Sequence, residues 1–179
     1  MECKRVLVIG CSGSGKSTLA LELSKKTKLP VVHLDNLFWD TNWKKVSSDT
    51  FQQLLQEELS KDCWIMEGNY NSTLATRIQY CDTIIYLDLS GIKCIFRVMK
   101  RKIKSRGKKR SDMADNQAKF LDFNFLKWIW NYNSVNRETY YNMLRQSQKE
   151  YFILHNNRDI RKFLKFFTNE NSEKKGSAC

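Results

Sequence analysis

Short apolar runs alternate with helical patterns along most of this chain. The runs are rich in β-branched and aromatic residues, and they cover residues 6–9, 31–34, 64–66, 83–87 and 151–154. Between them lie segments with helical spacing, for example residues 18–26. Short buried strands separated by helices are typical of βα units around a parallel sheet. The pattern therefore predicts an α/β fold.

Two helical segments carry boundary signals that can be checked against a structure. Asp49 and Gln52 form a candidate capping pair for a helix that runs through Leu59. Residues 120–144 are predicted to be mainly helical, with a break at residues 131–134, where the sequence is Asn-Tyr-Asn-Ser. This segment is unusually aromatic, which favours packing between long helices, with a stacking surface for bases as the alternative.

A glycine-rich motif follows the first apolar run and precedes the first helical segment. The motif has the spacing G-x-x-x-x-G-K-[ST], and it consists of Gly10, Cys11, Ser12, Gly13, Ser14, Gly15, Lys16 and Ser17, with Thr18 next in the helix. Strand, loop and helix in this order are the context that a phosphate-binding loop requires. The alternative is a glycine-rich turn that binds nothing, with Cys11 as a small filler residue.

The chemistry of such a loop follows from its residue types. Glycines let consecutive backbone N–H groups approach an anion closely, and the helix N-terminus adds its positive end. Lys16 is expected to reach the β- and γ-phosphates and to be catalytic, while the Ser17 hydroxyl is expected to hold Mg²⁺. The predicted ligands of residues 10–18 are therefore ATP, or a related nucleoside triphosphate, and Mg²⁺.

Three carboxylates follow predicted strands. Asp35, Glu67 and Asp88 come after the second, third and fourth runs, so a parallel sheet would place them at the edge where the phosphate loop opens. An acid at the end of a strand beside the first one suits a water-mediated Mg²⁺ contact. Glu67 is the first candidate and Asp35 the second, against the alternative of helix caps or solvated loop acids. His33 is expected to be packed.

A basic segment is the candidate clamp for the transferring phosphoryl group. The expected catalytic arginines are Arg97, Arg101, Arg106 and Arg110, on a short lid near residues 101–113. Two alternatives remain: a solvated basic loop, or a DNA-binding patch over residues 100–110.

Length and charge limit the remaining choices. The 179 residues suffice for one domain, expected over residues 1–168, followed by a polar tail over residues 169–179. The net charge of +12 favours an anionic partner. No apolar run is long enough to span a bilayer, the first residues lack a secretory signal, and the six cysteines form no paired spacing. We therefore expect a cytoplasmic protein without a membrane partner.

These motifs together resemble a known group of proteins. The chain is similar to adenylate-kinase-like P-loop proteins, and more narrowly to the family named DNA topology modulation proteins, over about residues 4–166. The resemblance lies in the phosphate loop, in His33-Leu34-Asp35 with Phe38-Trp39, in Trp64 to Tyr70, in Asp82 to Asp88, in Arg97 with Arg101, in Arg110 to Met113, and in the Trp128-Ile129-Trp130 neighbourhood. It implies a P-loop three-layer fold with a five-stranded parallel sheet of order 2-3-1-4-5.

One departure from that group concerns the acceptor. Nucleoside monophosphate kinases follow their third-strand acid with Gly-Phe-Pro-Arg, and the arginine grips the phosphate of the acceptor. Here Glu67 is followed by Gly-Asn-Tyr-Asn, and the next arginine is Arg77. Either Arg77 takes over that role or the acceptor is a different molecule. The residues expected to bind it are Asp35, Trp39, Tyr70 and Arg77.

Two functions remain at this point. The first is a small-molecule or nucleotide kinase that moves the γ-phosphoryl group of ATP to an unidentified acceptor. The alternative is a nucleotide-responsive regulator that binds DNA through the basic segment, affects DNA topology and does little chemistry. The carboxylates at the sheet edge favour the kinase, since a DNA binder has no need of them.

Overall fold

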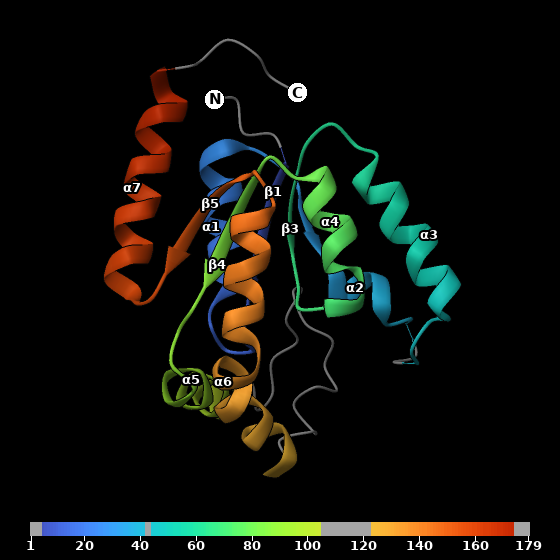
Figure 1. Ribbon diagram of the computed structural model, residues 1–179, viewed down its shortest axis with the longest axis vertical. Helices are drawn as coiled ribbons and strands as arrows, with labels where there is room; N and C mark the ends of the chain where they lie inside the picture. Colours follow the sequence, from blue (N-terminus) through green and yellow to red (C-terminus); the bar gives the residue numbers. More distant parts are fainter. Residues whose placement is uncertain (1–4, 42–43, 105–122, 174–179) are drawn as a thin grey trace.

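Five parallel strands form the central sheet of this protein. The computed structural model describes residues 5–41, 44–104 and 123–173 (Figure 1). The strand order is β2-β3-β1-β4-β5, which confirms the predicted α/β fold and the order 2-3-1-4-5. The strands are β1 (Arg5–Gly10), β2 (Val31–His33), β3 (Trp64–Glu67), β4 (Thr83–Leu87) and β5 (Glu150–Leu154).

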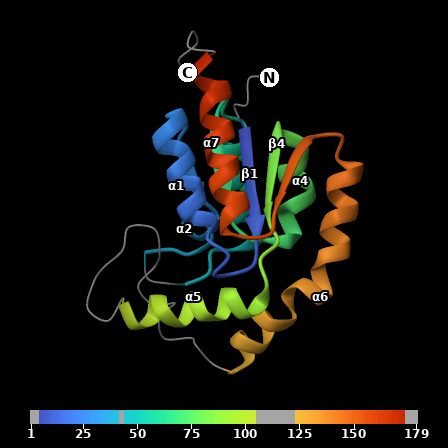
Figure 2. The same ribbon diagram turned by 90° about the vertical axis from the view of Figure 1, so that its left-hand side faces the viewer.

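Helices cover both faces of the sheet. In chain order the helical segments are α1 (Lys16–Thr27), α2 (Leu34–Phe38), α3 (Ser48–Leu59), the 3₁₀ turn η1 (Asn71–Thr73), α4 (Leu74–Tyr80), α5 (Gly91–Lys104), α6 (Phe123–Gln146) and α7 (Asn157–Glu173). Figure 2 shows α1 and α7 on one face and α4 and α6 on the other, with α5 crossing beneath the carboxyl ends of the strands. Within the described part of the chain, no helix has the length and apolar character needed to cross a membrane.

Two of the three inner strands, β1 and β4, explain why the first and fourth apolar runs lack alternation. β4 is buried at every position, and β1 is buried from its second residue onward. A parallel strand covered on both faces must be apolar on both sides, so its sequence reads as a continuous hydrophobic run. β5 lies at the sheet edge, and its first two residues are exposed.

The register of the strands brings the candidate site residues to one edge. Val8 of β1 is paired with Glu67 of β3, and His33 of β2 is paired with Glu67 from the other side. Gly10, which ends β1 and begins the glycine-rich loop, is paired with Leu87 at the end of β4. The last residues of these four strands therefore meet where α1 begins.

Two sequence-based boundaries inside the chain differ from the structure. The second strand ends at His33, and Leu34 already belongs to α2. The expected break at residues 131–134 is absent, because α6 is continuous from Phe123 to Gln146. Asparagine and serine side chains often compete with the helical backbone for hydrogen bonds. Here they donate to carbonyl oxygens, and the helix continues: the Asn133 amide donates to Leu89 O at 2.8 Å, and Ser134 Oγ donates to Asn131 O at 2.8 Å.

The C-terminal helix also extends further than expected. α7 runs to Glu173, past the boundary at residue 168 that the polar composition predicts. The expected lid is described only as far as residue 104, which ends α5, and residues 105–113 lie outside the described residues, as does the tail from residue 174.

The N-terminus of α3 is capped by a different residue from the one the sequence indicates. Ser47, not Asp49, occupies the N-cap position, and its hydroxyl accepts a hydrogen bond from the Thr50 backbone N–H at 3.0 Å. Asp49 lies in the first helical turn, where its charge still interacts favourably with the helix dipole. The sequence placed the cap two residues too late, because Ser and Asp are both good N-cap residues.

We expect Ser47→Ala to lower the free energy of unfolding by about 1 kcal/mol, since the N–H of Thr50 loses its acceptor. Asp49→Ala should cost about 0.5 kcal/mol, because it removes only a dipole interaction. Urea denaturation of both variants measures the difference. A larger loss for Asp49→Ala than for Ser47→Ala would contradict the observed cap.

Candidate active site

The glycine-rich loop adopts a backbone that few residues other than glycine can follow. Gly13 has a φ of +80° and Gly15 a φ of +100°, both in the left-handed region. A Cβ atom on Gly13 would lie 2.4 Å from the carbonyl oxygen of Cys94 in the first turn of α5. The loop is therefore packed directly against α5, and glycine at position 13 is required by space as well as by φ.

Three features of this loop fit a bound phosphate chain. Ser14 Oγ is buried and has no hydrogen-bond partner. The ammonium group of Lys16 donates to Cys11 O at 3.0 Å, within the loop itself. α1 begins after Gly15 with no side-chain cap and no acid in its first turn. Free N–H groups at a helix N-terminus, an unpaired hydroxyl and a lysine are the groups that phosphate oxygens use.

Glu67 connects this loop to the neighbouring strands. Ser17 Oγ donates to Glu67 Oε1 at 3.0 Å, and His33 Nδ1 lies 2.7 Å from the same oxygen. Burial of Glu67 opposes its charged form, but hydrogen bonds from His33 and Ser17 and the charge of Lys16 outweigh burial and hold the pKa of Glu67 below its ordinary value. Glu67 is therefore an ionised carboxylate beside the loop.

The residues present fit Mg²⁺ bound together with phosphates. In the described segments no cluster of three or more His, Cys, Asp or Glu side chains could hold a metal alone. Mg²⁺ is commonly held by one or two protein oxygens together with substrate phosphates and water. Ser17 and Glu67 would supply those oxygens. Asp35, the second candidate, accepts a hydrogen bond from the Tyr70 hydroxyl.

The expected acceptor residues form a cluster around Tyr70. The Tyr70 hydroxyl donates to Asp35 Oδ1 at 2.7 Å, and Trp39 also hydrogen-bonds to this hydroxyl. Burial raises the pKa of Tyr70, and the negative charges of Asp35 and Glu67 raise this pKa further. Phe38 packs on Tyr70 with ring centroids 4.7 Å apart. The structure thus brings Asp35, Trp39 and Tyr70 together beside Glu67.

Arg77 is placed differently from the sequence-based expectation. It is completely buried, and its guanidinium donates to Thr73 Oγ1 at 3.2 Å, to Gly68 O at 3.2 Å and to Tyr70 O at 2.6 Å. Burial lowers the pKa of Arg77 to about 10. Arg77 therefore holds the loop between β3 and α4, which carries Tyr70, and it does not reach out to an acceptor. The sequence indicated that Arg77 binds the acceptor because it is the first arginine after that loop.

Two of the four candidate clamp arginines, Arg97 and Arg101, lie on α5 within the described residues. Arg97 Nη1 donates to Ser14 O at 2.6 Å, and its Nη2 donates to Asn157 Oδ1. Arg101 lies one turn further along α5 and is half-buried. Arg106 and Arg110 lie outside the described residues. Arg97 thus joins the glycine-rich loop to the start of α7.

His33 is the site residue that sequence reasoning missed. Its position inside an apolar strand indicated packing, and it is mostly buried, but its Nδ1 faces Glu67 Oε1. The available signal was register: the last residues of neighbouring parallel strands, here His33 and Glu67, can pair across the sheet. That signal requires knowledge that β2 lies beside β3, which the apolar pattern alone does not contain.

Asp88, the third carboxylate at this edge, is used in the packing of α6. Arg137 donates to Asp88 Oδ1 at 3.0 and 3.1 Å, and Tyr141 donates to Asp88 Oδ2 at 3.1 Å. His155 Nδ1 lies 3.3 Å from the same Oδ2. Asp88 itself is almost fully buried. It therefore anchors α6 and the end of β5 to the sheet edge.

The comparisons with known proteins show the same architecture. The chain is 28% identical over 139 residues to the uncharacterized protein YqaC of Bacillus subtilis (strain 168), which covers 75% of this chain and 76% of that protein. It resembles shikimate kinase from Acinetobacter baumannii in complex with shikimate, with a TM-score of 0.63, 13% identity, and coverage of 97% and 96% of the two chains. It also resembles deoxyadenosine kinase from M. mycoides with bound dATP, with a TM-score of 0.57, 14% identity, and coverage of 93% and 98%.

These similarities establish the P-loop kinase fold of the chain. No family model matches the sequence. The narrower resemblance to DNA topology modulation proteins is therefore not confirmed, and the comparisons give no support to the DNA-binding alternative.

We expect Arg77→Met to lower the free energy of unfolding by about 2–4 kcal/mol, because the buried carbonyls of Gly68 and Tyr70 lose their donors. The matched control is Arg161→Met on the exposed side of α7, which should cost less than about 0.5 kcal/mol. Urea denaturation measures both values. Equal stability of the two variants would show that Arg77 does not hold the loop.

Proposed function

We propose that this protein is a phosphotransferase that moves the γ-phosphoryl group of ATP to a hydroxyl group of a small acceptor. The observation that carries the proposal is the contact of Ser17 with Glu67, beside a loop that has left-handed glycines and the ammonium group of Lys16. This arrangement supplies cations and N–H groups for phosphates and an ionised carboxylate for a metal. The shared fold of shikimate kinase and deoxyadenosine kinase supports the same class of reaction.

Phosphoryl transfer depends mainly on positioning and on neutralising negative charge. In this proposal the N–H groups of residues 10–18 bind the triphosphate and Lys16 neutralises the oxygens of its β- and γ-phosphates. Mg²⁺, held by Ser17 and through water by Glu67, would neutralise further charge on the triphosphate. Arg97 keeps the loop in place through Ser14 O and, with Arg101, presents positive charge on α5. Arg106 and Arg110 remain candidates for the same role.

Asp35 is the group proposed to meet the acceptor. Tyr70 occupies one carboxylate oxygen of Asp35, and the other oxygen is able to accept the proton of a hydroxyl group as it attacks the γ-phosphorus. Trp39 and the aromatic rings beside Tyr70 would bind the apolar part of the acceptor. Because Arg77 is engaged with backbone carbonyls, the acceptor has no arginine at that position for a phosphate. A hydroxyl compound therefore fits this site better than a nucleoside monophosphate.

The proposal predicts that Lys16→Ala abolishes phosphoryl transfer, with a loss of about 10²–10³-fold or more, because the charge on the transferring group is no longer neutralised. ADP release from ATP and Mg²⁺ over a panel of nucleosides and hydroxy acids measures the activity. Lys25→Ala, on the exposed side of α1, is the matched control and should keep full activity. Normal turnover by Lys16→Ala would exclude this mechanism.

The role of Asp35 has its own test. Asp35→Asn preserves shape and can still accept the Tyr70 hydrogen bond, but it is a much weaker base, so kcat should fall about 10²–10⁴-fold while ATP affinity by calorimetry stays unchanged. Tyr70→Phe keeps the aromatic packing and should lower kcat less than about tenfold. A fully active Asp35→Asn enzyme would remove Asp35 from the reaction while leaving the phosphate loop unaffected.

A further inference from the structure

The outer face of α5 carries a row of exposed apolar side chains. Ile92, Phe96, Met99 and Ile103 are 63%, 65%, 48% and 73% exposed, and they follow one another at intervals of four, three and four residues. This spacing places them in one stripe along a helix. We name these four residues the α5 stripe.

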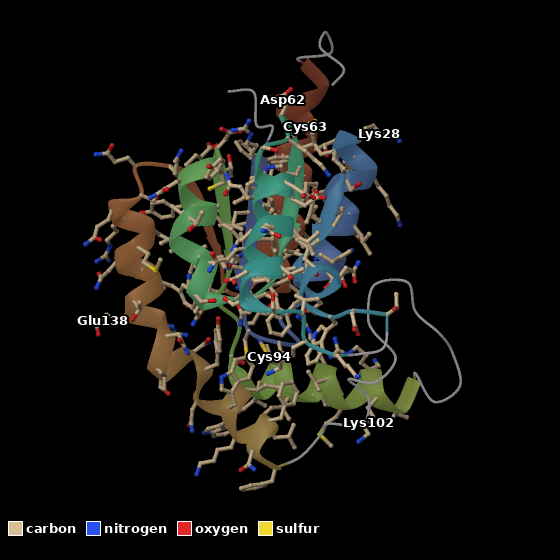
Figure 3. All side chains as sticks on the ribbon, turned by 90° about the vertical axis from the view of Figure 1, so that its right-hand side faces the viewer. Lys28, Asp62, Cys63, Cys94, Lys102 and Glu138 are labelled. Carbon is tan, nitrogen blue, oxygen red and sulfur yellow. The ribbon has the colours of Figure 1, made fainter. Side chains whose placement is uncertain are left out.

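Among the residues that the structure describes, the α5 stripe lies on the side of the helix opposite to the core. The opposite side of the helix carries Cys94 and Val98, which are buried, and the carbonyl of Cys94 contacts the glycine-rich loop. Figure 3 shows Cys94 between α5 and the sheet and Lys102 on the outer side of the same helix. The stripe is therefore not part of the core, although it is as apolar as a core-facing stripe.

The start of α6 adds large exposed rings beside α5. Phe123 and Trp130 are 79% and 59% exposed. The two helices are in contact, since a Cβ atom on Gly91 would lie 3.0 Å from Trp130 O. The expectation that the aromatic residues of this segment serve helix packing is thus right for Tyr132 and Tyr140, which are buried, and wrong for these two.

The charged residues of α5 and of the first half of α6 have a single sign. Residues 91–104 contain no Asp or Glu, and their basic residues are Lys93, Arg97, Lys100, Arg101, Lys102 and Lys104. Residues 123–137 likewise contain no acid. The surface of α5 and of the first half of α6 is therefore apolar along its crest and positively charged at its sides.

We propose that α5 docks on the surface of an anionic phospholipid bilayer. A helix with one apolar face, lysines and arginines on its polar side and low overall hydrophobicity is the kind that lies in a membrane interface. Aromatic rings suit the headgroup level, and lysines are attracted by anionic lipids. Phe96 and Ile103 would insert between headgroups while Lys93, Lys100 and Lys102 contact lipid phosphates.

Two other occupants fit the stripe less well. A second copy of this chain would bring two uniformly basic helices together with no carboxylate on either helix to neutralise them. DNA would attract the lysines, but its phosphates make no use of a row of isoleucine, phenylalanine and methionine. An anionic surface with an apolar interior satisfies both the charge and the stripe.

Docking in this way would orient the candidate active site. Arg97 lies on α5 and contacts Ser14 O, so the bilayer would lie next to the end of the molecule where the phosphate loop opens. The sequence-based expectation of no membrane partner considered only whether a segment could cross a bilayer. A helix that lies in the interface is recognised only when its outward face is known.

The test is co-sedimentation of the full chain with sucrose-loaded vesicles. We expect binding to vesicles that contain phosphatidylglycerol, little binding to pure phosphatidylcholine, and a loss of binding at high salt because the charges are screened. The double variant Phe96→Ser, Ile103→Ser should bind at least about tenfold more weakly, because two apolar side chains no longer insert. The control Phe166→Ser, at an exposed phenylalanine on α7, should bind like the unmodified chain. Lys93→Gln, Lys100→Gln and Lys102→Gln should each weaken binding about fivefold.

Unchanged circular dichroism and melting of these variants would show that they fold, as expected for exposed positions. The proposal is overturned if the unmodified chain does not bind phosphatidylglycerol vesicles, or if the Phe96→Ser, Ile103→Ser variant binds them equally well. It is also overturned if sedimentation shows a dimer that this variant converts to a monomer and that vesicles leave intact. Phosphoryl transfer does not enter the readout, so failure here leaves the proposed kinase activity untouched.

Discussion

The ionised carboxylate of Glu67, buried at the edge of the sheet, is the constraint on which the site depends. A buried carboxylate without partners costs several kcal/mol or takes up a proton. Here the partners come from two elements: Ser17 and the charge of Lys16 from the start of α1, and His33 from β2. Because β2, β3 and β1 are neighbours in the sheet, the strand order itself supplies the groups that keep Glu67 charged.

A second contact joins the same loop to α5. Gly13 packs against the Cys94 carbonyl, and Arg97 donates to Ser14 O from one turn further along the helix. Burial and hydrogen bonding at one side of α5 therefore fix the shape of the phosphate loop, while the other side carries the α5 stripe. If that stripe meets a bilayer, the same helix contacts the phosphate loop on one side and the lipid on the other.

The loop between β3 and α4 shows how a residue can belong to a site without touching a ligand. Arg77 uses its guanidinium to hold the Gly68 and Tyr70 carbonyls, and Tyr70 in turn holds Asp35. Arg77 is thus a buried structural cation, although the sequence suggested an arginine that binds the acceptor. This arrangement leaves an acceptor side that is built from a carboxylate and aromatic rings.

Local sequence was sufficient for the strands and for the phosphate loop, although it misplaced the N-cap of α3 by two residues. The strands are short apolar runs, and the phosphate loop is a contiguous motif whose glycines, lysine and serine must lie together, so both could be predicted. Glu67 and Asp35 could be placed at the loop edge because parallel strands all end there. Tertiary structure alone decided the rest, since contacts between distant residues depend on which elements pack together: the pairing of His33 with Glu67, the burial of Arg77, and the outward direction of the α5 stripe.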